Sequence, residues 1–194
     1  MPFVHHVPMK ASLLILLVFQ CWSLQAQDRE LLRVQRSKIT FVSDAPLEYI
    51  TATNEKVEGI LDPNARTFAL RIPMGDFNGF NSPLQREHFN ENYILTRKFS
   101  NATFSGRLIE AIDLSLPGEY TGRAKGEFTL KGITRERIIP CKIMVSEEGV
   151  QVSAAFDVLL DEHDIRVPKV VQQKISSVVK VEVDVLFGSG PTSQ

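Results

Sequence analysis

The sequence predicts an all-β, antiparallel fold of about eight strands with one or two short helices. Apolar and polar residues alternate with period two over about eight segments, and turn-forming residues separate these segments at regular spacing. The alternation leaves one polar face on each segment, which is typical of antiparallel sheets with one face in water. About eight such strands form either a sandwich or a closed barrel, and the strand pattern alone leaves both open.

In the first half of the chain, the predicted strands cover residues 37–42, 47–60, 67–74 and 103–109. The third of these shows the alternation well, because Phe68, Leu70 and Ile72 fall on one face of the strand. The dipeptide Asp62-Pro63 supplies turn-forming residues just before it.

Two segments break the period-two pattern. Residues 83–93 are predicted to be helical, since Pro83 suits the first position of a helix. Residues 168–178 follow Pro168 and are expected to contain a second short helical turn.

The second half of the chain gives the strongest strand signals, over residues 119–130, 139–145, 150–160 and 179–187. In the last segment, Val179, Val181 and Val183 share one face, while Lys180 and Glu182 lie on the other. A tight turn at residues 147–149 is expected to join two of these strands as a hairpin.

Residues 1–26 are expected to be a signal peptide rather than part of the fold. Residues 11–24 form an apolar run that is short for a bilayer span, which takes about 20 residues. Lys10 precedes this run and Ala26 offers a cleavage point, so residues 27–190 would form one exported domain, periplasmic or secreted. The alternative is an N-terminal membrane anchor.

Two cysteines bear on this expectation. Cys21 lies inside the predicted signal peptide, which a lipoprotein signal acylated at this cysteine would be an alternative to. Translation could also start at Met9 instead of Met1. Cleavage after Ala26 would leave only Cys141, which excludes an internal disulfide in the exported domain. Cys141 falls between apolar neighbours and is expected to be a buried small side chain rather than a nucleophile.

The composition argues against several functions. The chain has 194 residues, of which 43% are hydrophobic, enough for a sizeable core. Its 22 basic and 23 acidic residues are interspersed and give a net charge of -1. This pattern predicts neither a nucleic-acid-binding face nor a polybasic membrane patch.

Several motifs resemble those of the YceI-like family. The segment GEFTLKGITR at 126–135 is similar to the family's G-x-L-T-(I/L)-(H/K)-G-V-T-(R/K) pattern, and FSNATF at 99–104 resembles its P-x-(I/A)-T-F strand entry. SKITF at 37–41 resembles the family's first strand, and EHFNENY at 87–93 stands where the family has a short helix. The resemblance extends from about Leu31 to Phe187, although the family's R-S-D-F-G and K-H elements are missing.

The resemblance implies a lipocalin-like barrel that holds a polyisoprenoid or similar amphiphile, such as a quinone or a fatty acyl lipid, for transport or storage. The inward face of the predicted strands would then line the ligand-binding lumen. This predicted set is Phe68, Leu70, Phe104, Leu108, Phe128, Leu130, Phe156, Val158, Val181 and Val183. The alternatives are a filled barrel that acts as an envelope interaction or stress-associated module and, less favoured, a lipid-modifying enzyme.

His88 and Arg123 are the candidates for contacts with a ligand head group. No second histidine follows His88 within a helical turn, so no metal site is predicted, and neither a cofactor nor a catalytic constellation stands out. The acidic segment 161–164 is expected to be a surface turn. No nucleic-acid partner and no membrane span after signal cleavage are expected, and a homodimer is left open.

Overall fold

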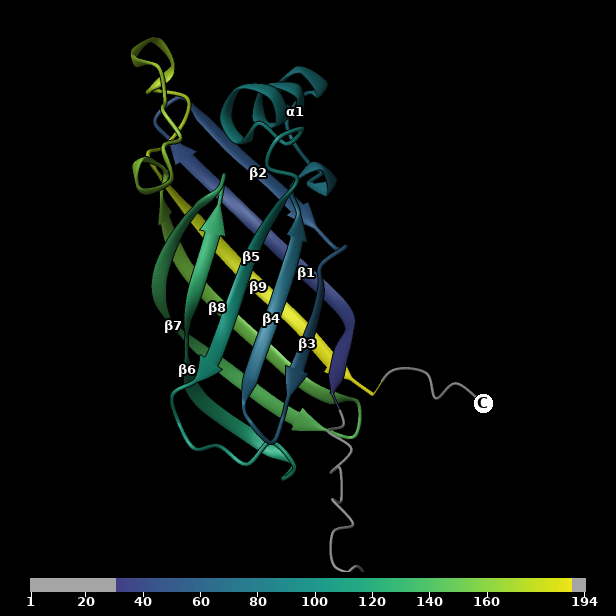
Figure 1. Cartoon of the computed structure of the whole chain (residues 1–194). Helices are drawn as coiled ribbons and strands as arrows, with labels where there is room; N and C mark the ends of the chain where they lie inside the picture. The colour runs from purple at the N-terminus through teal and green to yellow at the C-terminus, as the bar shows by residue number, and fades with distance from the viewer. Residues whose placement is uncertain (1–30, 190–194) are drawn as a thin grey trace, which may run out of the picture.

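The computed structural model describes residues 31–189, and the expected signal peptide lies outside them. The strands form one antiparallel sheet that closes on itself where β1 pairs with β9 (Figure 1). The strands are β1 (Leu32–Ala45), β2 (Glu48–Asn54), β3 (Glu58–Asp62), β4 (Thr67–Pro73), β5 (Asn101–Leu108), β6 (Gly118–Leu130), β7 (Ile133–Ser146), β8 (Gly149–Leu159) and β9 (Val178–Gly188). The helical segments are η1 (Met74–Asp76), α1 (Pro83–His88), η2 (Phe89–Ile94), η3 (Leu160–His163) and η4 (Lys169–Val171).

The nine strands make an eight-stranded barrel because β2 and β3 share one position in it. Both strands pair with β1: β2 pairs with its upper part through residues 48–54, and β3 pairs with its lower end at residues 32–33. Only β3 pairs in turn with β4. The prediction of an all-β antiparallel fold is therefore confirmed, and the closed sheet decides for a barrel over a sandwich. The single strand predicted over 47–60 is wrong, since the chain leaves the ladder at residues 55–57.

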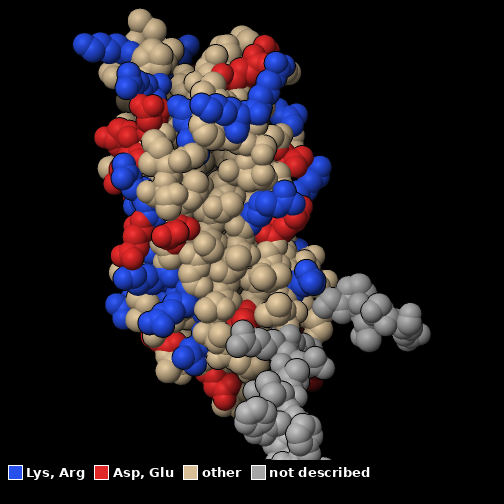
Figure 2. Space-filling model, viewed as in Figure 1, with Lys and Arg blue, Asp and Glu red and all other residues tan. Residues whose placement is uncertain are grey.

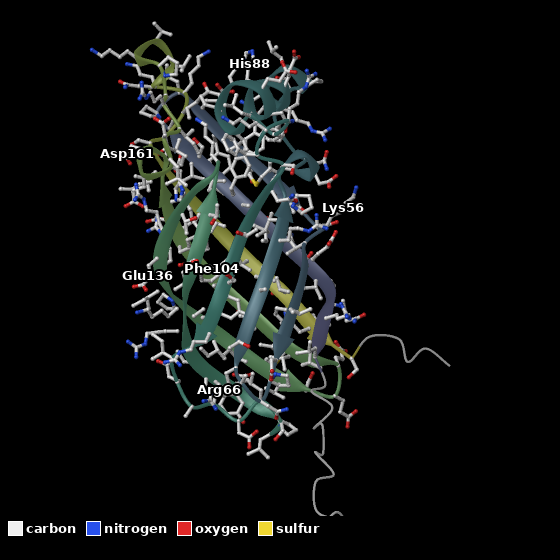
Figure 3. The ribbon with its side chains drawn as sticks, in the orientation of Figure 1. Lys56, Arg66, His88, Phe104, Glu136 and Asp161 are labelled. Carbon is white, nitrogen blue, oxygen red and sulfur yellow. The ribbon has the colours of Figure 1, made fainter. Side chains whose placement is uncertain are left out.

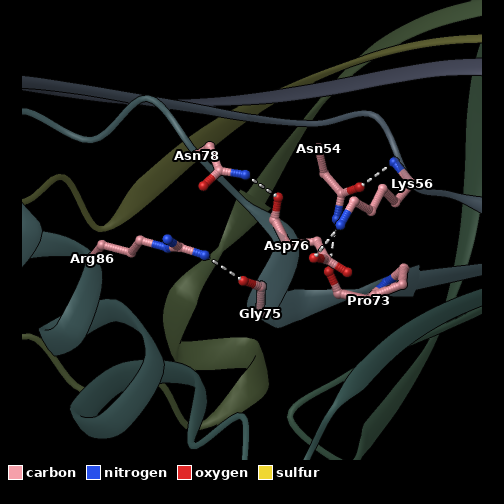
Figure 4. Close-up of polar contacts among 7 residues, drawn as sticks. All are labelled: Asn54, Lys56, Pro73, Gly75, Asp76, Asn78 and Arg86. Carbon is pink, nitrogen blue, oxygen red and sulfur yellow. Dashed lines mark hydrogen bonds and ion pairs between the residues drawn. The ribbon is translucent and has the colours of Figure 1, made fainter.

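Asn54 explains this interruption (Figure 4). Its side chain is fully buried and donates from Nδ2 to the carbonyl oxygen of Pro73 at 2.6 Å. Its Oδ1 accepts from the backbone N–H of Lys56 at 2.7 Å, and the N–H of Val57 donates to Ser37 Oγ at 3.2 Å. Side chains thus replace the ladder hydrogen bonds, which lets the chain step from β2 to β3 with its buried polar groups paired.

The helical segments all lie at one end of the barrel, called here the upper end, and the opposite, lower end carries two short turns and the loop between β5 and β6 (Figure 1). Helix α1 begins as predicted: Pro83 occupies the first turn, and Ser82 Oγ accepts from the N–H of Gln85 at 3.2 Å. The predicted helix over 83–93 is confirmed, but from Phe89 to Ile94 it is a π-helix, and Leu95 ends it in the left-handed region at φ 60°. None of the helices within residues 31–189 is long and apolar enough to cross a membrane.

The upper halves of β7 and β8 do not pair, and we call this opening the seam. β7 pairs with β6 along its whole length and β8 with β9, but β7 and β8 pair only from the Cys141–Ala154 level down to their turn. Segment η3 lies at the seam: Arg137 pairs with Glu162 at 2.6 Å, and Arg135 Nε donates to the Glu162 carbonyl at 3.1 Å. Helix η3 therefore takes the place of the missing ladder.

Candidate ligand-binding cavity

The barrel encloses a cavity of about 530 Å³. Its floor is formed by apolar side chains near the lower end, among them Leu61, Leu114 and Phe187. Its mouth lies among the helical segments of the upper end, where residues of α1 and of the chain after β8 line it. The volume falls within the range of roughly 300–1,000 Å³ that is usual for sites that bury a small-molecule ligand.

All ten residues predicted to face the lumen line this cavity. They are Phe68, Leu70, Phe104, Leu108, Phe128, Leu130, Phe156, Val158, Val181 and Val183. Six of them, including Phe104 and Phe156, are only half-buried although they point inward, so their remaining accessible surface faces the lumen. Side chains packed on one another would bury this surface, and the space is therefore open rather than filled.

An aromatic band crosses the middle of the wall. Phe104, labelled in Figure 3, lies on the barrel wall with its ring centroid 5.0 Å from that of Phe68 on β4 and 6.5 Å from that of Phe128 on β6. Phe128 meets Phe156 of β8 at 6.2 Å, edge to face. These contacts are typical of rings that prefer offset or edge-on packing, and they line the wall with large apolar surfaces.

Gly106 and Gly126 keep the wall thin beside this band. They are direct partners in the β5–β6 ladder, and a Cβ on Gly106 would lie 2.1 Å from the Lys125 carbonyl oxygen and 2.5 Å from the Gly126 Cα. No side chain fits at either position without moving the partner strand. The inward face of β5 and β6 therefore carries no side chain at this level, which leaves space in the lumen.

A second aromatic cluster, at the upper end, was not predicted. Phe41 of β1 stacks on Phe89 of η2 at 5.4 Å and contacts Phe77 at 5.3 Å, while Phe80 lies 5.2 Å from Phe89. All four rings line the cavity. Three of them come from the 77–89 segment, where period-two alternation gives no signal, so only the aromatic content of this segment pointed to them.

Polar lining residues gather at the mouth. Ser82, Gln85 and His88 come from the α1 region, Glu48 is the first residue of β2, and Lys174 follows η4. Gln85 Nε2 donates to Glu48 Oε1 at 2.8 Å. His88, labelled in Figure 3, thus lies at the mouth, at the end of α1. This is where the head group of a ligand in the lumen would lie.

Arg123 is not among the lining residues. It points outward from β6, and its Nε donates to Glu110 Oε1 at 2.7 Å. The Arg123 backbone N–H also donates to Glu110 Oε2, at 2.6 Å. The two hydrogen bonds from Arg123 hold the pKa of the Glu110 carboxyl below its usual range. The structure therefore does not bring the two predicted head-group residues together.

Cys141 lines the cavity near its lower end, as its inward phase predicted. Its Sγ–H donates to the Gly122 carbonyl oxygen at 3.5 Å. Burial, followed by the nearby Glu110 carboxylate, raises the pKa of the thiol. The thiol therefore stays protonated at neutral pH and is a poor nucleophile there.

His163 was expected in an acidic surface turn, but it is fully buried. Its ring lies edge-on against Phe128 at 5.3 Å, and Nδ1 is 3.2 Å from the Ile133 carbonyl oxygen across the seam. The expectation of a surface turn is wrong at this residue, because η3 turns inward to cover the seam. Within residues 31–189 no group of three or more His, Cys, Asp or Glu side chains is placed to hold a metal ion.

The fold and the cavity together define a closed antiparallel barrel with an open apolar lumen and a polar mouth. The sequence model of the YceI-like domain matches residues 32–187, and the chain belongs to this family. The expected family resemblance is thereby confirmed. The comparison with curated proteins finds no match.

Solved structures with the same fold are distant in sequence. A polyisoprenoid binding domain from Saccharophagus degradans, implicated in plant cell wall breakdown, is 13% identical with a TM-score of 0.70, over 83% of this chain and 99% of that one. BcnA of Burkholderia cenocepacia is 13% identical with a TM-score of 0.65, over 77% and 94%. The YCEI protein of Campylobacter jejuni is 10% identical with a TM-score of 0.55, over 70% and 82%. At these identities the likeness shows the fold.

Proposed function

We propose that this protein is an exported, non-catalytic binding protein that holds a polyisoprenoid or a similar amphiphilic lipid in its lumen, for transport or storage. The observation that carries the proposal is the open cavity of about 530 Å³, whose deep walls are apolar and whose polar lining residues gather at the mouth. That division matches a ligand with a long apolar tail and a small polar head. The name of the similar Saccharophagus degradans domain, which binds polyisoprenoid, supports the same class of ligand.

The size of the cavity bounds the tail. At roughly 30 Å³ for each water-sized group, it has room for about 15–20 methylene or methyl groups. Burying one five-carbon unit gains roughly 3–4 kcal/mol before ordering costs, so tail length would dominate the affinity. The open lumen favours this proposal over a filled-barrel interaction module.

The mouth favours a head group with little net charge. Among the described residues that line the cavity, Lys174 is the one cation and Glu48 the one carboxylate. The Glu48 carboxylate already accepts the hydrogen bond from Gln85. An isoprenoid alcohol, a quinone or a fatty acyl group would suit such a mouth better than a multiply charged head, which needs several donors or cations.

The first test is mass spectrometry of an organic extract from the protein purified gently from its native host. A stoichiometric isoprenoid, quinone or fatty acyl species is the expected result. The matching test in solution measures uptake of a dansyl-labelled fatty acid and its displacement by geranylgeraniol. An empty extract together with no uptake of either lipid would overturn the proposal.

Two variants in β9 test whether the ligand lies in the lumen. Val183→Trp adds bulk to an inward, half-buried position at mid-lumen, and Glu182→Trp adds the same bulk to the exposed outer face. We expect the first variant to bind the dansyl lipid at least tenfold more weakly, which corresponds to about 1.4 kcal/mol, and the second to bind it as wild type does. Equal effects of the two variants would argue against a lumen site.

A further inference from the structure

Three segments border the mouth of the cavity and are called here the rim. They are the β1–β2 turn at Leu47, the start of α1 at Leu84, and the segment 169–174 around η4. The Gln85–Glu48 hydrogen bond of 2.8 Å joins α1 to the first residue of β2, and the N–H of Leu47 donates to the Gln173 carbonyl oxygen at 2.8 Å. These two contacts link α1 and the segment 169–174 through the β1–β2 connection, so the three segments lie together at the upper end.

The tips of this rim are apolar and exposed. Val170 is 91% exposed and Leu47 is 65% exposed, the two highest values for large hydrophobic residues in the described chain, and Leu84 follows at 58%. Each comes from a different segment of the rim. Three protruding apolar side chains around an apolar opening are costly to leave in water, and such clusters mark interaction sites.

The segment that carries Val170 is also cationic. Residues 165–175 contain Arg166, Lys169 and Lys174 and no Asp or Glu, and Arg166 pairs with Asp164 at 3.1 Å. Lys169 and Lys174 form no ion pair with any residue that the structure describes. Figure 2 shows blue side chains around the tan tip of this lobe, at the top left. The balanced composition of the whole chain conceals this local excess of positive charge.

We propose that the rim docks on an anionic lipid bilayer, with Val170 and Leu47 inserted among the head groups and Lys169 and Lys174 against their negative charges. Apolar side chains flanked by lysines are the pattern by which proteins bind the membrane interface. Docking in this orientation turns the mouth of the cavity toward the bilayer. An apolar tail then passes between membrane and lumen without crossing water, which extends the proposed function to the source of its ligand.

The test reads the position of the tip directly. A polarity-sensitive fluorophore is attached to Val170→Cys in a Cys21→Ser background, where Cys141 is buried with a raised pKa and escapes labelling. Its matched control is Leu116→Cys, which replaces a leucine that is 56% exposed in the loop between β5 and β6, at the lower end. Both proteins are mixed with vesicles of phosphatidylcholine alone and of phosphatidylcholine with phosphatidylglycerol.

We expect a blue shift of the label at position 170 with the anionic vesicles, weakened by salt, and none at position 116. Replacing Lys169 or Lys174 by alanine should weaken the titration by on the order of fivefold for each lysine. No shift at position 170 would overturn the proposal, as would equal shifts at both positions. A shift at position 170 without vesicles that grows with protein concentration would assign the rim to a second copy of the chain instead.

Binding of the dansyl lipid is measured on the same proteins. A blue shift at position 170 in a protein that takes up no lipid would support docking and count against the proposed function. Lipid uptake without any shift would do the reverse, so the two proposals fail separately.

Discussion

The lower and upper halves of this barrel are built differently. In the lower half β7, β8 and β9 pair without a break, and inward side chains such as Ile143, Val150 and Val185 are no more than 2% exposed. In the upper half the ladder is broken twice, at residues 55–57 and at the seam between β7 and β8. Some inward side chains there, such as Phe41, Phe156 and Val181, are only half-buried, and helical segments cover the end (Figure 1).

This difference shows how one sheet provides both stability and space. Close packing and full pairing in the lower half stabilise the fold, while the upper half leaves apolar surface uncovered as the wall of the cavity. Two of the four buried side-chain polar atoms without a hydrogen-bond partner in the described chain, Arg137 Nε and His163 Nε2, lie at the seam. Half of these unpaired buried atoms thus lie where the ladder is open.

The largest expected effect comes from truncating one valine in each half of the same strand. Val185 in β9 is 1% exposed, whereas Val181, four residues earlier, faces the lumen and is half-buried. We expect Val185→Ala to lower the free energy of unfolding by about 2–3 kcal/mol, because it removes two methyl groups from a close-packed site. Val181→Ala should cost less than about 1 kcal/mol, since part of its surface already faces open space.

Urea denaturation of the ligand-free proteins measures both values. The dansyl lipid titration should show the opposite order, with the larger loss of affinity in Val181→Ala. Equal losses of stability in the two variants would mean that the lumen is packed as tightly as the lower core, and the contrast between the halves would fail.

The next largest effect is on stability and comes from replacing His163, which is buried at the seam. Burial is the main cause that lowers the pKa of this histidine below its ordinary value of 6.5, and Arg137 contributes in the same direction, whereas Glu162 and the carbonyl groups of Ile133 and Leu130 oppose the shift. At pH 7.5 we expect His163→Phe to cost about 1 kcal/mol, the loss of the hydrogen bond to Ile133. As the pH falls through 6.5, the unfolded wild-type chain takes up a proton that the folded protein does not.

The contribution of His163 is therefore present above pH 6.5 and is lost on acidification. Thermal melts from pH 7.5 downward should show the gap in Tm between wild type and His163→Phe narrowing. His88→Phe, which makes the same substitution at an exposed histidine away from the seam, is the control. A gap that stays constant or widens would show that the folded protein binds the proton as readily as the unfolded chain.

The strands and the lumen wall could be read from the sequence because side-chain alternation is a local property. Period two assigns Phe68, Phe104, Phe128 and Phe156 to one face of their strands, and closure of the sheet makes that face the inside. The two helical segments could also be predicted locally, because Pro83 and Pro168 mark where they start.

The parts that sequence reasoning missed depend on contacts between distant segments. Asn54 looks like any polar residue near the end of a strand, and its role appears only once Pro73 lies beside it. His163 belongs to an acidic tetrapeptide that reads as surface, and the open seam that buries it is a property of the barrel. The alternation likewise gives Arg123 an outward direction but says nothing of which end of the barrel it lies near.

The smallest expected effect comes from replacing the two residues predicted to contact a ligand head group. His88 lies at the mouth, whereas Arg123 points outward and is held by Glu110. We expect His88→Ala to weaken binding of the dansyl lipid by roughly two- to fivefold, the range for losing one hydrogen bond at an exposed site. Arg123→Ala should leave the affinity unchanged, because neither its side chain nor that of Glu110 reaches the cavity. If Arg123→Ala weakened binding as much as His88→Ala, the ligand would have to reach the lower end, and the assignment of the mouth to the upper end would be wrong.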